Sequence, residues 1–188
     1  MKKPVETEIK LRLPNLAAAR AVLRTHGFRI IVRRVFEQNL LLDDSANSIR
    51  KRGMLLRIRR AGKLVTCTFK GVLKPGPYKS REEREFQVSD FDEALALFAG
   101  LGYTESMRYE KYRTEFGAQT AGGTVTFDET PIGNFLELEG SGPWIDEMAL
   151  RLGFTAADYV LESYGRLYLA YSKKQGVQPL NMVFPADS

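Results

Sequence analysis

Apolar and polar residues alternate without interruption from residue 5 to residue 13. Successive side chains of a β-strand point to opposite faces, so this alternation predicts a strand. One face carries Val5, Thr7, Ile9, Leu11 and Leu13, and the other carries Glu6, Glu8, Lys10 and Arg12. Taken alone, the pattern is typical of a strand that packs its apolar side and turns its polar side to water.

The same two-residue period recurs in later segments, and each time it gathers polar side chains on one face. These segments cover residues 54–61, 63–71, 81–88, 103–116, 124–128 and 135–139. Their polar faces carry Arg57 and Arg59; Thr66, Thr68 and Lys70; Arg81, Glu83 and Glu85; Lys111, Arg113 and Glu115; Thr124, Thr126 and Asp128; and Glu137 and Glu139. The first two segments predict a hairpin around Gly62, and residues 28–42 predict either two strands or one long bent strand.

Helices are predicted between the strands. They cover residues 16–25, a segment capped by Ser89 and ended by residues 100–102, residues 143–152 and residues 157–175. The first two present apolar stripes, formed by Leu16, Ala19, Val22 and Leu23 and by Leu95, Phe98 and Leu101. Residues 43–48 are predicted to form a loop. We expect one domain over residues 1–175, followed by a flexible tail over 176–188.

Two architectures fit this pattern. In the first, the apolar faces of the sheet form the core and the charged faces meet bulk water. In the second, the sheet closes into a barrel with a charged lumen, and amphipathic helices cover its apolar outer face. The apolar stripes of the helices need an apolar partner, which the second arrangement supplies, but alternation alone leaves both open.

The composition narrows the chemistry that a charged lumen could perform. The chain has 188 residues, a net charge of +5, one histidine (His26) and one cysteine (Cys67), so a disulfide framework and a Cys-based zinc site are excluded. We read His26 as a helix-end residue. Metal chemistry would therefore rest on carboxylates, which favour Mg²⁺ or Mn²⁺. The sequence shows no membrane-spanning run and no signal-peptide pattern, so we expect a cytoplasmic protein.

A charged lumen would need a ligand of its own. Its inward bases would repel one another without a polyanion, and its inward acids would repel one another without a cation. The bases are Lys10, Arg57, Arg59, Lys70, Arg81, Lys111 and Arg113, and the acids are Glu6, Glu8, Asp128, Glu137 and Glu139. A divalent cation that bridges carboxylates to phosphates would satisfy both sets, and it is the usual means of catalysing phosphoryl transfer.

The residues also carry a resemblance to a known family. Glu6-x-Glu8-x-Lys10 resembles the ExExK motif of the CYTH superfamily, the triphosphate tunnel metalloenzymes, and further family pieces follow in the family's order over residues 4–170. These pieces are Leu56-Arg57-Ile58-Arg59, Thr68-Phe69-Lys70, Arg81-Glu82-Glu83-Arg84-Glu85, Lys111-Tyr112-Arg113 and the run from Thr126 to Gly140. The resemblance implies an α+β fold, an eight-stranded antiparallel β-barrel or tunnel flanked by amphipathic helices, which binds a triphosphate inside.

The resemblance also implies roles for individual residues. Mg²⁺ or Mn²⁺ would be held by Glu6, Glu8, Asp128, Glu137 and Glu139. The phosphates would be gripped by Lys10, Arg57, Arg59, Lys70, Arg81, Lys111 and Arg113. Glu83 and Glu85 would position a water or a second metal, and they form the candidate catalytic set with Lys10 and Arg57. From the final helix we expect Arg166 to reach the phosphates, with Lys173 and Lys174 as alternatives, and we expect Tyr164 to pack rather than to face the tunnel. Leu42 departs from the family pattern, which often has an aromatic residue before the Asp at this place, and Asp43 is read as a turn residue.

The leading function is metal-dependent hydrolysis of the terminal phosphoanhydride of tripolyphosphate or a related triphosphate. The alternatives are a class IV adenylyl cyclase that makes cyclic AMP and pyrophosphate from ATP, a thiamine triphosphatase with an aromatic platform (Tyr78, Tyr103 or Trp144), and a polyphosphate-binding module without turnover. Nucleic acid is a less favoured partner, and a homodimer stays open. The loop over residues 74–79 is either a lid or a passive surface loop.

Overall fold

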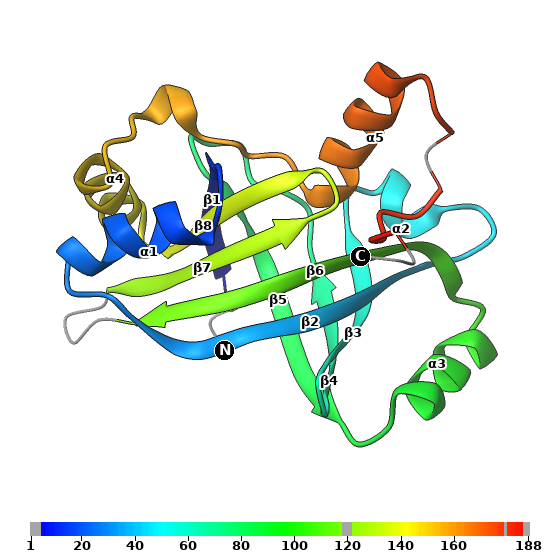
Figure 1. Ribbon diagram of the computed structural model, residues 1–188. Coiled ribbons are helices and arrows are strands. Elements are labelled where there is room, and N and C mark those ends of the chain that lie inside the picture. Colours follow the sequence, from blue (N-terminus) through cyan, green and yellow to red (C-terminus); the bar gives the residue numbers. More distant parts are fainter. Residues whose placement is uncertain (1–4, 118–121, 179, 186–188) are drawn as a thin grey trace.

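The computed structural model describes residues 5–117, 122–178 and 180–185, and its centre is one antiparallel barrel (Figure 1). The strands are β1 (Val5–Leu13), β2 (Arg29–Asp43), β3 (Leu55–Ala61), β4 (Leu64–Lys70), β5 (Lys79–Val88), β6 (Thr104–Gly117), β7 (Gly123–Thr130) and β8 (Gly133–Gly140). The helices are α1 (Leu16–Thr25), α2 (Ser48–Lys51), α3 (Phe91–Gly100), α4 (Gly142–Arg151), the 3₁₀ turn η1 (Ala156–Asp158) and α5 (Tyr164–Gln175).

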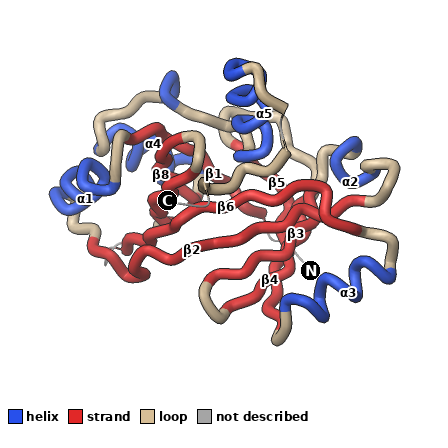
Figure 2. Tube along the Cα trace, turned by 45° about the vertical axis from the view of Figure 1, so that its right-hand side comes forward, coloured by secondary structure: helices blue, strands red, loops and turns tan. Residues whose placement is uncertain are grey.

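The barrel closes in the order β1-β5-β4-β3-β2-β6-β7-β8, and every neighbouring pair is antiparallel. β1 joins the ends of the sheet, because Glu8 lies opposite Lys79 of β5 and opposite Glu139 of β8. Residues 29–43 form one long strand with register shifts against β6, which is the bent-strand alternative. The expected eight-stranded antiparallel barrel is confirmed, and Figure 2 shows its strands from a second direction.

The apolar core lies outside the barrel, between the sheet and the helices. The outward side chains of β1, β7 and β8, such as Ile9, Phe127 and Leu138, are fully buried together with Leu23 of α1 and Ile145 of α4. Burying a side chain of this size stabilises the fold by about 1.5–3 kcal/mol. Because the outward face is the apolar one, the alternating pattern must turn its charged face inward.

A second core cluster lies between α3 and the outer face of β2, β3 and β4 (Figure 1). Phe91 and Ala94 are buried there, and Leu95 and Phe98 pack against them. Leu101, which we expected on this stripe, is 65% exposed because the helix ends before it. The N-cap also differs from the expected Ser89: the side chain of Asp90 accepts from the backbone N–H groups of Asp92 and Glu93.

Asp43 lies where a loop was predicted, and it organises a short helix instead. Its carboxylate accepts hydrogen bonds from the backbone N–H groups of Asp44 at 3.0 Å, Ile49 at 2.9 Å and Arg50 at 3.0 Å. These bonds satisfy donors at the start of α2 that have no partner within the helix. Asp43 is the last residue of β2 and pairs with Thr104 of β6, so it lies at a strand end and not in the turn that we predicted.

The single helix predicted over residues 157–175 is wrong. The chain forms η1, runs extended past Val160, and enters α5 only at Tyr164. Val160 exchanges two backbone hydrogen bonds with Lys10, at 2.9 and 3.1 Å, and this pairing holds the segment away from helical geometry. The tail also differs from expectation within its described residues, because Met182 is fully buried against β6.

Candidate active site

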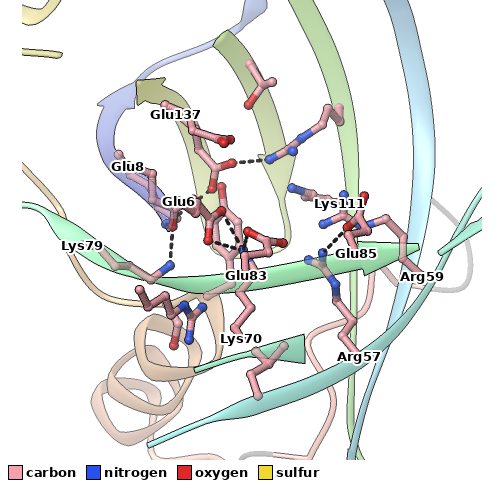
Figure 3. Close-up of a pocket in the computed structure, with 18 of the residues that line it drawn as sticks. Glu6, Glu8, Arg57, Arg59, Lys70, Lys79, Glu83, Glu85, Lys111 and Glu137 are labelled. Atoms are coloured by element: carbon pink, nitrogen blue, oxygen red, sulfur yellow. Dashed lines mark hydrogen bonds and ion pairs between the residues drawn. The ribbon is translucent and has the colours of Figure 1, made fainter. Parts of the chain in front are cut away.

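The inward faces of the strands enclose a cavity of about 720 Å³ that is lined mainly by charged side chains (Figure 3). Thirteen of the residues expected to face a lumen line it: Glu6, Glu8, Lys10, Arg57, Arg59, Lys70, Arg81, Glu83, Glu85, Lys111, Arg113, Glu137 and Glu139. The two-residue period places them there, because each strand turns alternate side chains inward. Of the two architectures that the sequence left open, the one with the charged lumen is the observed one.

One side of the cavity, here called the acid-rich wall, is built from β1, β5 and β8. It carries Glu6, Glu8, Glu83, Glu137 and Glu139, with Lys10, Lys79 and Arg81 among them and Lys70 reaching in from β4. Glu8 is the centre of this wall: it lies 3.0 Å from the Lys10 ammonium and is also paired with Lys79. Burial raises the pKa of Glu8, but these two ammonium groups lower it more, so the net pKa lies well below the usual value.

Glu6 differs from Glu8, although both lie on the same face of β1. Lys70 contacts Glu6 at 2.6 Å and Glu83 at 2.9 Å, so one ammonium group serves two carboxyl groups. Burial and the negative charge of Glu8 raise the pKa of Glu6 to about 8, more than Lys70 lowers it. Burial also raises the pKa of Glu139, which makes no ion pair with any other described residue. The acid-rich wall therefore crowds five carboxyl groups together, and the raised pKa of Glu6 keeps that group largely protonated at pH 7.

The opposite side, here called the base-rich wall, is built from β2, β3 and β6. It carries Arg57, Arg59, Lys111 and Arg113, with Glu37 among them and Asp128 of β7 behind them. Arg57 donates to the hydroxyl oxygens of Tyr109 at 3.2 Å and Thr68 at 3.0 Å, and to Glu85 at 3.4 Å. These contacts fix its guanidinium at the cavity surface, while its buried Nε has no hydrogen-bond partner among the described residues.

The other bases of this wall are held by buried acids. Arg59 donates to Asn39 at 2.8 Å and to Glu37 at 3.4 Å, and Lys111 lies 3.5 Å from Glu37. Burial raises the pKa of Glu37, but Lys111 and Arg59 lower it further, to about 2. The carboxylate of Glu37 therefore stays ionised and holds two cations in place.

Asp128 is placed differently from the expected metal ligand. It is fully buried, and its carboxylate accepts from Lys111, Arg113 and the Tyr164 hydroxyl, each at 2.7 Å. It does not line the cavity. Arg113, which it orients, also pairs with Glu137 of the acid-rich wall. The arrangement gives Asp128 a positioning role towards two phosphate-binding candidates.

The structure places Arg166 outside the cavity. Its side chain is exposed, as are those of Lys173 and Lys174, and the residues near the start of α5 that line the cavity are Ser163, Tyr164 and Gly165. The position where α5 begins explains this placement. The helix starts at Tyr164 and directs that side chain into the cavity, where its ring lies 5.1 Å from the Lys10 ammonium.

Sequence reasoning missed four side chains that shape the cavity: Lys79, Glu37, Asn39 and Tyr109. The two-residue period could have identified each of them. Lys79 and Tyr109 precede Arg81 and Lys111 by two residues, and Glu37 and Asn39 share a phase in β2. Lys79 was assigned to the loop over residues 74–79, but in the structure it is the first residue of β5.

The aromatic residues considered for a substrate platform do not line the cavity. Tyr78 donates to Asp146 of α4 at 2.6 Å, Trp144 packs against the outer core, and Tyr103 packs against the core under α3. Tyr78 thus ties the loop over residues 74–79 to α4. Whether this loop also acts as a lid stays a prediction.

The donor set of the acid-rich wall fits a hard divalent cation in its chemistry. It is made of carboxylate oxygens, the ligands that Mg²⁺ and Mn²⁺ prefer, and it includes the unpaired Glu139 and the crowded Glu6. Glu8 and Glu139 face each other across β1 and β8. In the described part of the chain no three acidic, His or Cys side chains already converge as a metal cluster, and lysines lie between the glutamates instead.

Buried donors without a partner indicate a ligand rich in oxygen acceptors. Among the described residues, Nε of Arg57, Nε of Arg81 and the hydroxyl of Thr126 are buried without a hydrogen-bond partner, and all three residues line the cavity. An unpaired buried donor costs about 1–3 kcal/mol. Phosphate oxygens would satisfy such donors.

Comparison with known proteins identifies the family and the fold. Residues 5–150 match the CYTH domain family, and no curated protein matches the sequence. The solved structures of similar fold include a proposed adenylate cyclase from Vibrio parahaemolyticus, with 17% identity, a TM-score of 0.75, and 88% of this chain and 98% of that chain covered.

Two further structures extend the comparison. The PH1819 protein of Pyrococcus horikoshii has 25% identity and a TM-score of 0.73, with 88% of this chain and 99% of that chain covered. A proposed adenylyl cyclase from Hippeastrum, described as having a dominant triphosphatase activity, has 18% identity and a TM-score of 0.63, with 92% of this chain and 97% of that chain covered. In the described residues, no helix is long and apolar enough to cross a membrane.

Proposed function

Because the chain belongs to the CYTH domain family, we propose that it is a divalent-cation-dependent enzyme that hydrolyses a triphosphate bound inside the barrel. The leading substrate is inorganic tripolyphosphate. The observation that carries this proposal is the division of the cavity into a base-rich and an acid-rich wall. A protein that only bound polyanions would gain nothing from the five glutamates of the acid-rich wall.

The proposed reaction is attack of water on the terminal phosphorus. A new P–O bond forms to the water oxygen, the bond to the bridging oxygen breaks, and pyrophosphate leaves with the electron pair of that bond. The water proton passes to a carboxylate or to solvent. Glu83 and Glu85 lie on the inward face of β5 and are the candidates to orient the water.

The bases of the cavity would bind and orient the phosphate chain. Arg57 and Arg59 offer planar donors that match phosphate oxygens, and Lys10, Lys70, Lys111 and Arg113 add charge. Glu6, Glu8, Glu137 and Glu139 would hold the divalent cation, with Asp128 acting through the bases that it orients. The cation, when bound, neutralises phosphate charge and polarises the phosphoryl oxygens.

The lining favours a hydrolase over a nucleotide cyclase. A cyclase must recognise adenine and direct the ribose 3′-hydroxyl at the α-phosphorus. The aromatic residues of the described lining are Tyr109 and Tyr164, and their hydroxyls are hydrogen-bonded to Arg57 and Asp128. The dominant triphosphatase activity described for the Hippeastrum structure points the same way.

Product analysis tests the proposal. The purified protein is incubated with Mg²⁺, with Mn²⁺ or with EDTA, and separately with tripolyphosphate, ATP and thiamine triphosphate. Orthophosphate and pyrophosphate from tripolyphosphate, lost with EDTA, are the expected result. Cyclic AMP and pyrophosphate from ATP would establish a cyclase. Turnover confined to thiamine triphosphate would change the substrate, and binding without any turnover would leave a binding module.

A further inference from the structure

The strand pairing of the barrel wall is incomplete along one edge of β6 in the described residues. β2 pairs with one edge of β6 along Thr104–Gly117, but the described pairing of β7 with the other edge runs only from Tyr112 to Phe116. The edge around residues 108–110 therefore extends beyond the β7–β8 hairpin. Tyr109 lies in this stretch and lines the cavity.

The C-terminal tail covers this gap. Met182 pairs with Tyr109 in parallel register: its N–H donates to the Arg108 carbonyl at 3.0 Å, and its carbonyl accepts from the Glu110 N–H at 2.8 Å. The side chain of Asn181 accepts from the Arg108 N–H at 2.8 Å. The contact is a single parallel bridge of the kind that an added strand makes, and with Asn181 it satisfies the backbone N–H groups of Arg108 and Glu110 on this edge of β6.

Side-chain packing also connects the C-terminal tail to β6. Met182 is fully buried in a cluster with Tyr109, Phe135 and Tyr164, and this cluster lies where α5 and the tail meet β6 (Figure 1). The ring of Phe184 lies 5.2 Å from that of Tyr112 on the next outward position of β6. The segment is thus fixed by backbone bonds and by packing on either side of its bridge to β6.

From Tyr109 the chain of contacts leads into the cavity. The Tyr109 hydroxyl accepts from Arg57 at 3.2 Å, and Arg57 is the base-rich wall residue whose buried Nε lacks a partner among the described residues. Met182 therefore lies behind the group that orients Arg57. A change at Met182 can reach the cavity without touching a bound ligand.

We propose that residues 180–185 serve as an additional wall strand of the tunnel and that Met182 is a positioning residue, which sets the place of Arg57 through Tyr109. The wall-strand part stands on the described contacts alone. The effect on ligand binding rests on the proposed function, with inorganic tripolyphosphate as the probe.

The first experiment measures amide hydrogen exchange in the full chain, comparing wild type with Met182→Ala. We expect the Glu110 amide to lose protection in Met182→Ala, because loss of the buried side chain loosens the tail and so withdraws the Met182 carbonyl that accepts from this amide, while the protection of β7 and β8 amides is kept. Val183→Ala, at the adjoining 38% exposed position, is the matched control and should leave Glu110 protected. A Glu110 amide that exchanges freely in the wild type would overturn the wall strand, and unchanged protection in Met182→Ala would overturn the role of the Met182 side chain in holding it, whatever the enzyme's substrate.

The second experiment measures tripolyphosphate affinity by calorimetry. Met182→Ala and Tyr109→Phe should each weaken binding about fivefold, and the double variant should be no weaker than either, because both act on Arg57 in series. Met182→Leu should restore wild-type affinity, since it refills the volume. If Met182→Ala fails to fold, Met182→Val makes the same comparison.

The outcomes of the two experiments are separable. If wild type binds no tripolyphosphate, the proposed function fails and the exchange data alone decide the wall strand. If Met182→Ala lowers only the melting temperature while the folded protein keeps its affinity, the positioning role is overturned. Multiplying effects of Met182→Ala and Tyr109→Phe would also overturn it, because they would show that the two residues act independently.

Discussion

The acid-rich and base-rich walls face each other across one cavity, but the pairing of acids with bases differs between them. In the base-rich wall the buried acids Glu37 and Asp128 are held by bases: the pKa of each falls to about 2, because neighbouring Lys and Arg groups outweigh the effect of burial. In the acid-rich wall the pKa of Glu6 rises to about 8 through burial and the charge of Glu8, and Glu139 lies without an ion-pair partner among the described residues.

This difference separates two uses of a buried carboxylate. Glu37 and Asp128 act as internal counterions that hold the bases proposed to bind phosphate in one geometry. The glutamates of the acid-rich wall are crowded, so protonation is favoured at Glu6, and a bound cation could take the place of that proton. Four measurements test this contrast, and they are ordered here from the largest expected effect to the smallest.

The largest effect is expected in the acid-rich wall. Glu139→Gln and Glu8→Gln should each lower kcat for tripolyphosphate at least about 100-fold, because each removes a carboxylate proposed to hold the cation. Steady-state assays over a Mg²⁺ titration measure the loss, and circular dichroism checks the fold. Glu147→Gln on the exposed face of α4 is the control and should keep wild-type activity. Unchanged turnover in Glu139→Gln would remove it from the cation site.

A smaller effect is expected in the base-rich wall. Arg57→Ala should raise KM and lower kcat, each by about tenfold, because the same phosphate contacts serve the bound substrate and the transition state. The matched control is Arg60→Ala: Arg60 is the outward neighbour of Arg59 on β3 and lies over the Phe91 ring at 4.1 Å. Equal, mild effects of the two variants would show that Arg57 does not contact the ligand.

The counterion role of Glu37 predicts a stability effect that depends on pH. Its pKa is lowered from 4.5 to about 2, so its ionised form stabilises the folded state above about pH 4.5, and this contribution is lost as the pH falls towards 2. Glu37→Gln should lower the free energy of unfolding by about 3 kcal/mol at pH 7. Urea titrations at pH 7, 5 and 4 should show the gap between wild type and variant narrowing below pH 4.5. A gap that does not change with pH would show that packing, not charge, accounts for the loss.

The smallest effect is expected at Arg166. Because its side chain is exposed and lies outside the cavity, Arg166→Ala should change kcat/KM by less than about twofold. Tyr164→Phe is the informative partner, since it removes the hydroxyl that donates to Asp128 and should weaken activity more. A large loss in Arg166→Ala would show that α5 moves to bring Arg166 onto the substrate.

Much of the barrel could be predicted from the sequence, because a strand's two-residue period is a local property. The alternation in residues 5–13 and 81–88 named both faces of β1 and β5, and the inward faces carry the expected charges. Local patterns were less reliable where tertiary contacts compete with them. The helix expected over 157–175 is interrupted because Val160 pairs with Lys10, 150 positions away in the sequence.

The candidate site shows the same contrast between what a local pattern predicts and what tertiary contacts decide. The sequence alone determined which side chains share a face, and so which residues could line a common cavity. Only the tertiary structure decided which of them meet across strands. Asp128 is enclosed by Lys111, Arg113 and Tyr164, Arg166 points away, and Met182 of the expected free tail is buried behind Tyr109. Such contacts depend on barrel closure and on the docking of α5 and the tail, which join segments far apart in the chain and leave no periodic signal in it.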